Sequence, residues 1–553
     1  MALKQNVSFF MMPFFIKDQQ EKMFEPSGDS IWAPCQMAFD KGKLYSHIGD
    51  FLQPSNTDGT SYHYQYYSLS EHAGSLKEML RKQMAIEVKN SDGTNRYIFF
   101  SIGQAEDSKA EREKNAFNNT DKAKKKELSE TLESFFSPKL VICPSAGIGI
   151  LILSVQLDQS NDNKDNFSLN NLIDLNYAIF KTYPLGSTQT QSIYLKSQID
   201  IRNVQQKLVS VQDEKMKLRY EKQLEGMCKK IPEKITTASI ALGKNVQLLD
   251  VNTDWFWTMS ELTNCLMAEF SGLYERFDPY RLHVFTYFQV EESELSEALL
   301  DDYIRIMKLQ NRNYKVLSSS KNSDIFVKSF DNIYMGCTVE GGSIMTLLSE
   351  QQNSTDHGST FISDFMYSSL SQSYLWTYVM IQIQRYTLLH IEQQLTRHNY
   401  LKNSIVERQS LRELIRRSTQ NKVNSYFVDI SDHTQHNLFY SLCCRNLKVM
   451  EYSDSVERKL ELLTDYLKML TEEEQEEEAK RRDNIGRWIT VIGAVFALFS
   501  SSYDAFGLFG DEYLGLINNS TPLYLRISVV LGSIIIVAIV FWSLARLYVG
   551  RKH

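Results

Sequence analysis

Hydrophobic residues near the C-terminus form two long runs. The first, Trp488–Phe509, contains one charge, Asp504, and the second, Ile527–Leu547, contains one internal charge, Arg546. A helix rises about 1.5 Å per residue, so each run is long enough to cross the ~30 Å hydrocarbon core of a bilayer. The pattern predicts a membrane anchor of two transmembrane helices.

Basic residues flank this predicted anchor. Lys480, Arg481, Arg482 and Arg487 precede the first run, and Arg546, Arg551 and Lys552 close the second. The loop between the runs and its edge hold only Arg526. Because basic residues remain on the cytoplasmic side, both termini are expected there. The prediction is a multi-pass membrane protein in contact with lipid.

Small and polar residues share one face of the first run when positions advance by 100° per residue. They are Gly486, Thr490, Gly493, Ala497, Ser500, Ser501 and Asp504. Close helix packing also explains small residues, whereas a carboxylate at the end of the stripe favours contact with water. The stripe is therefore interpreted as pore-lining, with Gly507, Asp511 and Glu512 at the outer mouth. One helix cannot enclose a pore, so a homo-oligomer is expected.

A long helix is predicted before the first run, starting near Tyr452. Its apolar positions alternate by four and three, as in the seam of a coiled coil: Val456, Leu460, Leu463, Leu467 and Leu470. Six glutamates follow, namely Glu472, Glu473, Glu474, Glu476, Glu477 and Glu478. A single copy would present them as a solvated helix face. In a ring of subunits they would form an acidic collar that concentrates cations.

The rest of the chain predicts a mixed α/β domain followed by long helices. Expected strands are Ser8–Ile16, Tyr97–Ile102, Leu140–Cys143, Ile148–Leu157, Leu282–Val290 and Ile333–Val339, and expected helices are Leu169–Lys181, Ser197–Lys230, Glu292–Gln310, Phe361–Ser418 and His436–Leu447. The fold class is thus α/β with a stalk helix and two C-terminal spans. The predicted domains are 1–350 for ligand sensing, 351–450 for long helices, 451–487 for the stalk and 488–553 for the pore with a short basic tail.

Composition narrows the range of functions. A net charge of -7 argues against direct nucleic-acid binding, and seven scattered cysteines without a CxxC pair fit a reducing compartment. No Walker, HExxH or GxSxG motif occurs, so no catalytic residue is assigned and the chain is not expected to be an enzyme. The glycines of PSAGIGILIL precede a strand pattern, which indicates a hairpin turn and not a phosphate-binding loop. The HxxH pair of His433 and His436 lacks further ligands, so no metal is assigned.

The order of these parts resembles the CorA-like divalent-cation channels, which are pentamers. That family carries Gly-Met-Asn at the outer end of the first span. Here the stretch is YDAFGLFGDEY, where Gly507 matches while Leu508 and Phe509 replace Met and Asn. The resemblance implies magnesium as a permeant ion and no permanently bound cofactor. Phe509 lacks the amide oxygen of Asn, which weakens the implied magnesium selectivity, although Asp504 could supply oxygen ligands.

The cytosolic part is longer than a housekeeping CorA requires. Together with the altered signature, it resembles the divergent CorA-like membrane effectors of type III CRISPR antiviral defence. That resemblance implies a location in the bacterial inner (plasma) membrane. It also implies a ligand-gated channel activated by a nucleotide second messenger, the conjugate of S-adenosylmethionine and AMP, at residues that no motif identifies. Two alternatives remain open, a constitutive magnesium or other divalent-cation transporter and a non-conducting membrane-anchored receptor.

Overall fold

A computed structural model describes most of the first 509 residues. The described ranges are 1–17, 29–35, 43–52, 64–103, 135–158, 166–181, 193–224, 258–348, 365–397 and 405–509, with short gaps inside several of them, together with Tyr524, Ile535, Ile539 and Trp542. In 498–509 the helical backbone is described without its side chains. The chain divides into two compact units, Met1–Leu462 and Leu463–His553.

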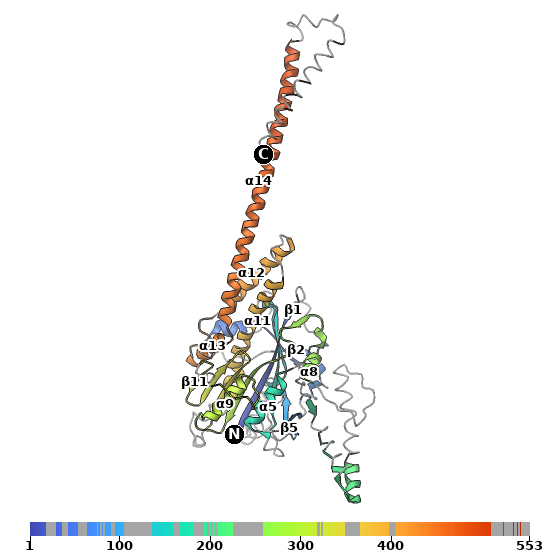
Figure 1. Cartoon of the computed structure of the whole chain (residues 1–553), viewed down its shortest axis with the longest axis vertical. Helices are drawn as coiled ribbons and strands as arrows, with labels where there is room; N and C mark the ends of the chain where they lie inside the picture. Colours follow the sequence, from blue (N-terminus) through green and yellow to red (C-terminus); the bar gives the residue numbers. More distant parts are fainter. Residues whose placement is uncertain are drawn as a thin grey trace, which may run out of the picture. The chain divides into compact units, whose positions relative to one another are not determined.

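The first unit is built on one mixed sheet of 13 strands (Figure 1). Its main path runs β11-β12-β13-β10-β1-β7-β5-β4-β8, with β2, β3, β6 and β9 joined at its side. Only β10 and β13 pair in parallel among the described strand pairs. The strands are β1 (Leu3–Ile16), β2 (Trp32–Pro34), β3 (Gln65–Leu69), β4 (Met84–Lys89), β5 (Asn95–Ile102), β6 (Lys139–Cys143), β7 (Ile148–Leu157), β8 (Ile193–Leu195), β9 (Tyr274–Arg276), β10 (His283–Val290), β11 (Phe326–Phe330), β12 (Ile333–Cys337) and β13 (Gly341–Leu347).

Strand β1 lies in the middle of the sheet because its sequence is apolar on both faces. VSFFMMPFF is buried without interruption, as expected for a strand covered on both sides. β1 pairs antiparallel with β10 on one side and with β7 on the other, and Phe10 has Val284 and Leu153 as its two neighbours. This central strand therefore supplies hydrophobic side chains to the packing on each face.

Helices cover both faces of the sheet. On β10 the side chain of Thr286 accepts a hydrogen bond from Asn176 in α5 (Leu169–Ile179), whereas its neighbour Phe285 stacks on Tyr378 in α11 (Leu375–Arg397). Successive strand residues point to opposite faces, so α5 and α11 lie on opposite sides. The other helices are α1 (Ser46–Leu52), α8 (Met259–Leu266), α9 (Glu297–Met307), α12 (Ile405–Ser425), α13 (Thr434–Asn446) and α14 (Val449–Phe509), with a π-helix at Met366–Tyr374 and 3-10 turns at Glu71–Ala73, Pro144–Ala146 and Ala268–Phe270.

Many predicted elements are present. The six expected strands correspond to β1, β5, β6, β7, β10 and β12, and the expected hairpin at PSAGIGILIL joins β6 to β7 with Gly147 at φ 65°. The predicted helix Phe361–Ser418 corresponds to the π-helix, α11 and part of α12, and residues 398–404 lie outside the described residues. Of the expected helix Ser197–Lys230, the structure describes helix mainly at 214–224.

The prediction of a membrane anchor is corrected. No helix among the described residues is long and apolar enough to cross a membrane. The residues of the first predicted span that are described with their side chains, Trp488 to Ala497, lie in α14. They continue a charged helix, and the second predicted span, Ile527–Leu547, lies almost wholly outside the described residues. This finding overturns the two-span CorA-like fold class, the ion-channel interpretation and the multi-pass inner-membrane localisation.

Candidate functional site

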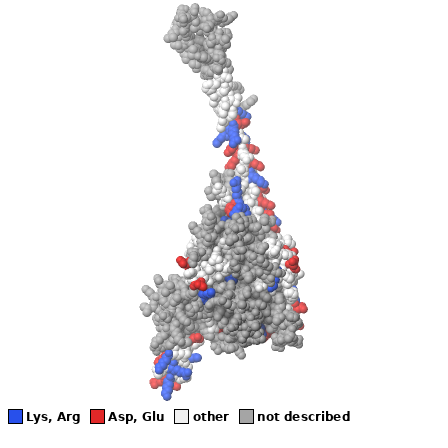
Figure 2. Space-filling view, turned by 180° about the vertical axis from the view of Figure 1, so that it is seen from behind, with Lys and Arg blue, Asp and Glu red and all other residues white. Residues whose placement is uncertain are grey.

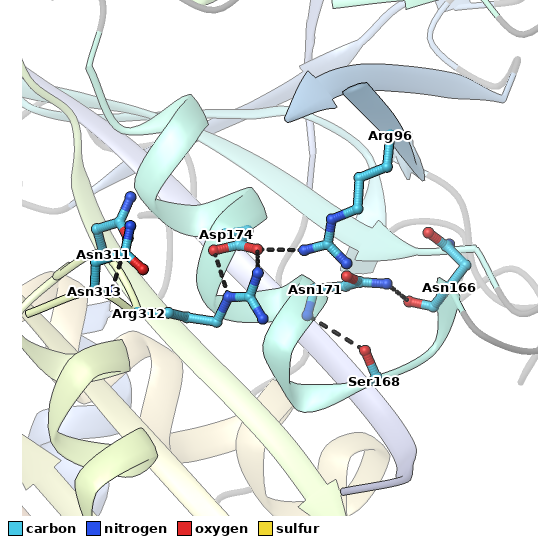
Figure 3. Close-up of polar contacts among 8 residues, drawn as sticks. All are labelled: Arg96, Asn166, Ser168, Asn171, Asp174, Asn311, Arg312 and Asn313. Atoms are coloured by element: carbon cyan, nitrogen blue, oxygen red, sulfur yellow. Dashed lines mark hydrogen bonds and ion pairs between the residues drawn. The ribbon is translucent and has the colours of Figure 1, made fainter. Parts of the chain in front are cut away.

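Three charged residues from distant parts of the chain meet beside α5 (Figure 3). Asp174 in α5 accepts hydrogen bonds from Arg96 in β5 and from Arg312, which follows α9. Arg312 holds the carboxylate with two nitrogens, Nε at 3.0 Å from Oδ1 and Nη2 at 2.8 Å from Oδ2. A two-pronged contact of this kind fixes the plane of the guanidinium.

The start of α5 positions Asp174. Ser168 caps the helix by accepting a hydrogen bond from the Asn171 backbone N–H, as polar residues before a helix commonly do. The Asn166 side chain donates to the carbonyls of Phe99 and Asp158 and accepts from the Phe99 N–H. These contacts attach the beginning of α5 to β5, the strand that carries Arg96.

The segment after α9 positions Arg312. Leu309 has a φ of 48°, a left-handed conformation that ends the helix and turns the chain. Asn311 then accepts the Asn313 N–H at 3.0 Å, a local turn typical of asparagine. The turn places Arg312 against Asp174 of the neighbouring helix.

The charges of this cluster do not cancel. Two guanidinium groups against one carboxylate leave a formal charge of +1 (2 − 1). The Asp174 side chain is only 6% exposed, whereas the side chains of Arg96 and Arg312 are 28% and 34% exposed. The Nε of Arg96 is buried without a hydrogen-bond partner among the described residues. We call Arg96, Asp174 and Arg312 the arginine cluster.

This arrangement can hold an anion. Asp174 keeps two guanidinium groups in fixed positions, and a guanidinium offers five N–H donors, more than this single carboxylate uses. Phosphate oxygens suit such a fork of donors in both charge and geometry. Asp174, the carboxylate of the cluster, is already engaged by both guanidinium groups, so the chemistry that the cluster offers is binding.

The residues predicted to line a pore lie along α14. Gly486, Thr490, Gly493 and Ala497 belong to its described part, where Thr490 Oγ1 donates to the Gly486 carbonyl at 2.9 Å and a Cβ added at either glycine would meet nothing within 4 Å. Ser500, Ser501, Asp504 and Gly507 lie in the helical backbone, but their side chains are outside the described residues, as are Asp511 and Glu512 entirely. Among the residues described with their side chains, Gly486, Thr490, Gly493 and Ala497 are not brought into a site, and the interpretation of the other residues stays a prediction.

The six glutamates also lie on α14, which carries both acidic and basic side chains along its length (Figure 2). Glu476 pairs with Lys480 at 3.5 Å and Glu478 with Arg482 at 3.7 Å, each one helical turn along. Such exposed pairs are typical of a solvated helix face.

The two histidines of the HxxH pair, His433 and His436, lie at the start of α13. His436 is buried, stacks on Tyr374 and contacts Ser373 Oγ at 3.0 Å, while His433 precedes the first residue of α13. Among the described residues, no group of three or more His, Cys, Asp and Glu side chains could hold a metal ion.

Sequence reasoning missed the arginine cluster because its members are far apart in the chain. One signal was available: Asp174 interrupts the apolar run LIDL of a helix that is otherwise buried on that side. A charged residue in such a position usually has a partner of opposite charge. The sequence does not say which arginine provides it.

Comparisons with protein-family models, with curated proteins and with solved structures found no match for this chain.

Proposed function

We propose that the first unit, Met1–Leu462, is a sensor domain that binds an anionic nucleotide at the arginine cluster. The supporting observation is the pair of guanidinium groups on one buried carboxylate, with a net positive charge and a buried Arg96 Nε left without a partner. A nucleotide phosphate would supply the missing acceptor and the compensating negative charge. The ligand class comes from the resemblance to effectors that respond to nucleotide second messengers.

The thermal stability of the full chain tests this proposal. A ligand that binds only the folded state raises the free energy of unfolding by about 2.7 kcal/mol at a hundredfold excess over its dissociation constant. We expect such a shift with an adenine nucleotide, the conjugate of S-adenosylmethionine and AMP being the first to try, followed by cyclic oligoadenylates, ATP and AMP.

Two substitutions locate the binding. Arg96→Met and Arg312→Met each remove a charged donor of similar length, and a hydrogen bond to a charged group contributes about 1.5–3 kcal/mol. We expect each variant to bind the nucleotide at least tenfold more weakly. Arg417→Met is the matched control, because Arg417 is a largely buried arginine that pairs with Glu413 in α12.

The competing interpretation is an electrostatic clamp that joins α5, β5 and the segment after α9. A clamp predicts that both variants lose stability without nucleotide and that the unaltered chain shows no shift with any of the four ligands. That result would overturn the proposed function.

A further inference from the structure

A second positively charged group lies on the opposite face of the sheet, between β10 and α11. Arg385 of α11 is only 9% exposed. Among the described residues it makes no ion pair, and its Nε is buried without a hydrogen-bond partner. The Cζ of its guanidinium lies 5.6 Å from the centroid of the Tyr386 ring. An arginine this deeply buried is normally paired, because an isolated buried charge is strongly unfavourable.

The polar groups one turn before Arg385 are also incompletely paired. Gln382 Nε2 lies 2.7 Å from His283 Nε2, and His283 also contacts the hydroxyl of Tyr378. The other amide atom of Gln382, Oε1, is buried without a partner. If the amide is turned over, His283 donates to Oε1 and two N–H donors of Gln382 are left over. In that orientation the amide offers N–H donors to an anion, whereas in the other orientation it offers an acceptor oxygen, which does not bind an anion.

Close packing surrounds Tyr378, the residue whose hydroxyl contacts His283. Tyr378 stacks on His283 and Phe285 with centroids 5.6 and 4.5 Å away, and it lies against Gly342, where an added Cβ would come within 2.7 Å of the ring. Burial and the Arg385 charge both lower the pKa of His283, to about 3, so this histidine is neutral at physiological pH and supplies no second positive charge. Burial raises the pKa of Tyr386, and the charge of Asp278 raises it further. Among the described residues, Asp278 forms no ion pair with Arg385.

We propose that Arg385 and Gln382 form a binding site for a small oxyanion, a carboxylate or a phosphate group, between the sheet and α11. The oxyanion would accept from the guanidinium and from the amide of Gln382, and its charge would compensate that of Arg385. This site lies on the other face of the sheet from the arginine cluster, so it is separate from the proposed nucleotide site.

The test uses the full chain with Arg96→Met and Arg312→Met already introduced, so that the arginine cluster does not contribute. Inorganic phosphate represents the phosphate group, and acetate and succinate represent carboxylates, all at constant ionic strength. We expect at least one probe to raise the melting temperature in a saturable way at millimolar concentration. Adding Arg385→Met should weaken that response at least tenfold, whereas Arg417→Met should leave it unchanged.

Stability without added anion separates a binding site from a structural role. If Arg385 lacks a partner, Arg385→Met should be as stable as its parent or more stable. Arg385→Lys keeps the positive charge but lacks the planar guanidinium with its fork of N–H donors. This variant should fold normally and should bind the anion more weakly. A saturable response that survives Arg385→Met, the absence of any response in the parent, or a marked loss of stability in Arg385→Met without anion would each overturn the proposal. None of these outcomes depends on nucleotide binding.

Discussion

At the scale of single residues, the first unit contains several polar side chains inside an apolar core. Ser8 and Asn176 both contact Thr286, at 3.2 and 3.0 Å, and link β1, β10 and α5. Tyr303 donates to the Ser343 carbonyl at 3.0 Å in the same way. A buried polar group is tolerated when it is hydrogen-bonded, and these pairs fix how each helix sits on the sheet. His283 differs from these residues because it is titratable. Its burial in the core lowers its pKa and so opposes its protonation.

The stability of the chain should therefore depend on the protonation of His283. Above pH 6.5 the imidazole is neutral in both the folded and the unfolded chain. As the pH falls from 6.5 toward the folded-state pKa of about 3, the unfolded chain takes up a proton that the folded chain does not, so the free energy of unfolding falls. From pH 7.5 to 5.5 this loss should be roughly 1.4 kcal/mol.

Urea denaturation of the unaltered chain and of His283→Gln at both pH values measures this contribution. On acidification from pH 7.5 to 5.5, the free energy of unfolding of His283→Gln should fall by roughly 1.4 kcal/mol less than that of the unaltered chain. His72→Gln, at an exposed position, controls for the loss of a histidine. Equal losses in the unaltered chain and His283→Gln would show that His283 is not held neutral by its surroundings.

At the scale of elements, the sequence predicts strands and helices better than it predicts sites. The apolar run of β1 and the turn at Gly147 depend on neighbouring residues, so local patterns are sufficient to find them. The arginine cluster joins residues 96, 174 and 312, and the Arg385 site joins β10 to α11. These contacts depend on the strand order, which no local pattern specifies. For α14, the predicted span was based on the length of its apolar run and on the flanking basic residues, and no helix among the described residues is long and apolar enough to cross a membrane.

Glycine substitutions should separate packed elements from unpacked ones. In β7, Gly149 is the partner of Phe14 in β1, and an added Cβ would lie 2.2 Å from the Phe14 ring. Gly149→Ala should therefore lower the free energy of unfolding by about 1–3 kcal/mol, the usual effect of overpacking. The Phe14 ring has little room to move, because it also packs edge-on against Tyr274 at 5.2 Å.

Gly486 in α14 is the matched case, since an added Cβ there meets nothing within 4 Å. Alanine is a better helix former than glycine by about 1 kcal/mol, so Gly486→Ala should increase helix stability. Thermal denaturation followed by circular dichroism measures both variants. A loss of stability in Gly486→Ala would indicate that this face of α14 packs closely against another surface.

At the scale of the whole molecule, the two units differ in how many of their described side chains are buried. The first unit contains the sheet and every hydrophobic cluster of the described residues, and its last buried side chains in α14 are Val456 and Leu460. After Leu460 no described side chain of α14 is buried, and Leu462, Ile489 and Phe496 are 72%, 65% and 71% exposed. The expected homo-oligomer, with a pentamer as the family implies, stays a prediction.

The fragment Met1–Leu462 should consequently fold without the rest of the chain. Ending it there removes no buried side chain of the described part of α14 and keeps the ion pair of Lys459 with Glu392 in α11. We expect a cooperative thermal transition within a few degrees of the one that the first unit shows in the full chain, because burial of apolar surface dominates folding stability. Calorimetry on both proteins, with circular dichroism to confirm the sheet, measures this.

The matched control is a fragment ending at Asn446, which lacks the buried Val449, Val456 and Leu460 and should be less stable by several kcal/mol. If the two fragments melt alike, the first turns of α14 do not belong to the core of the first unit, and if neither folds, the second unit is required for the stability of the first.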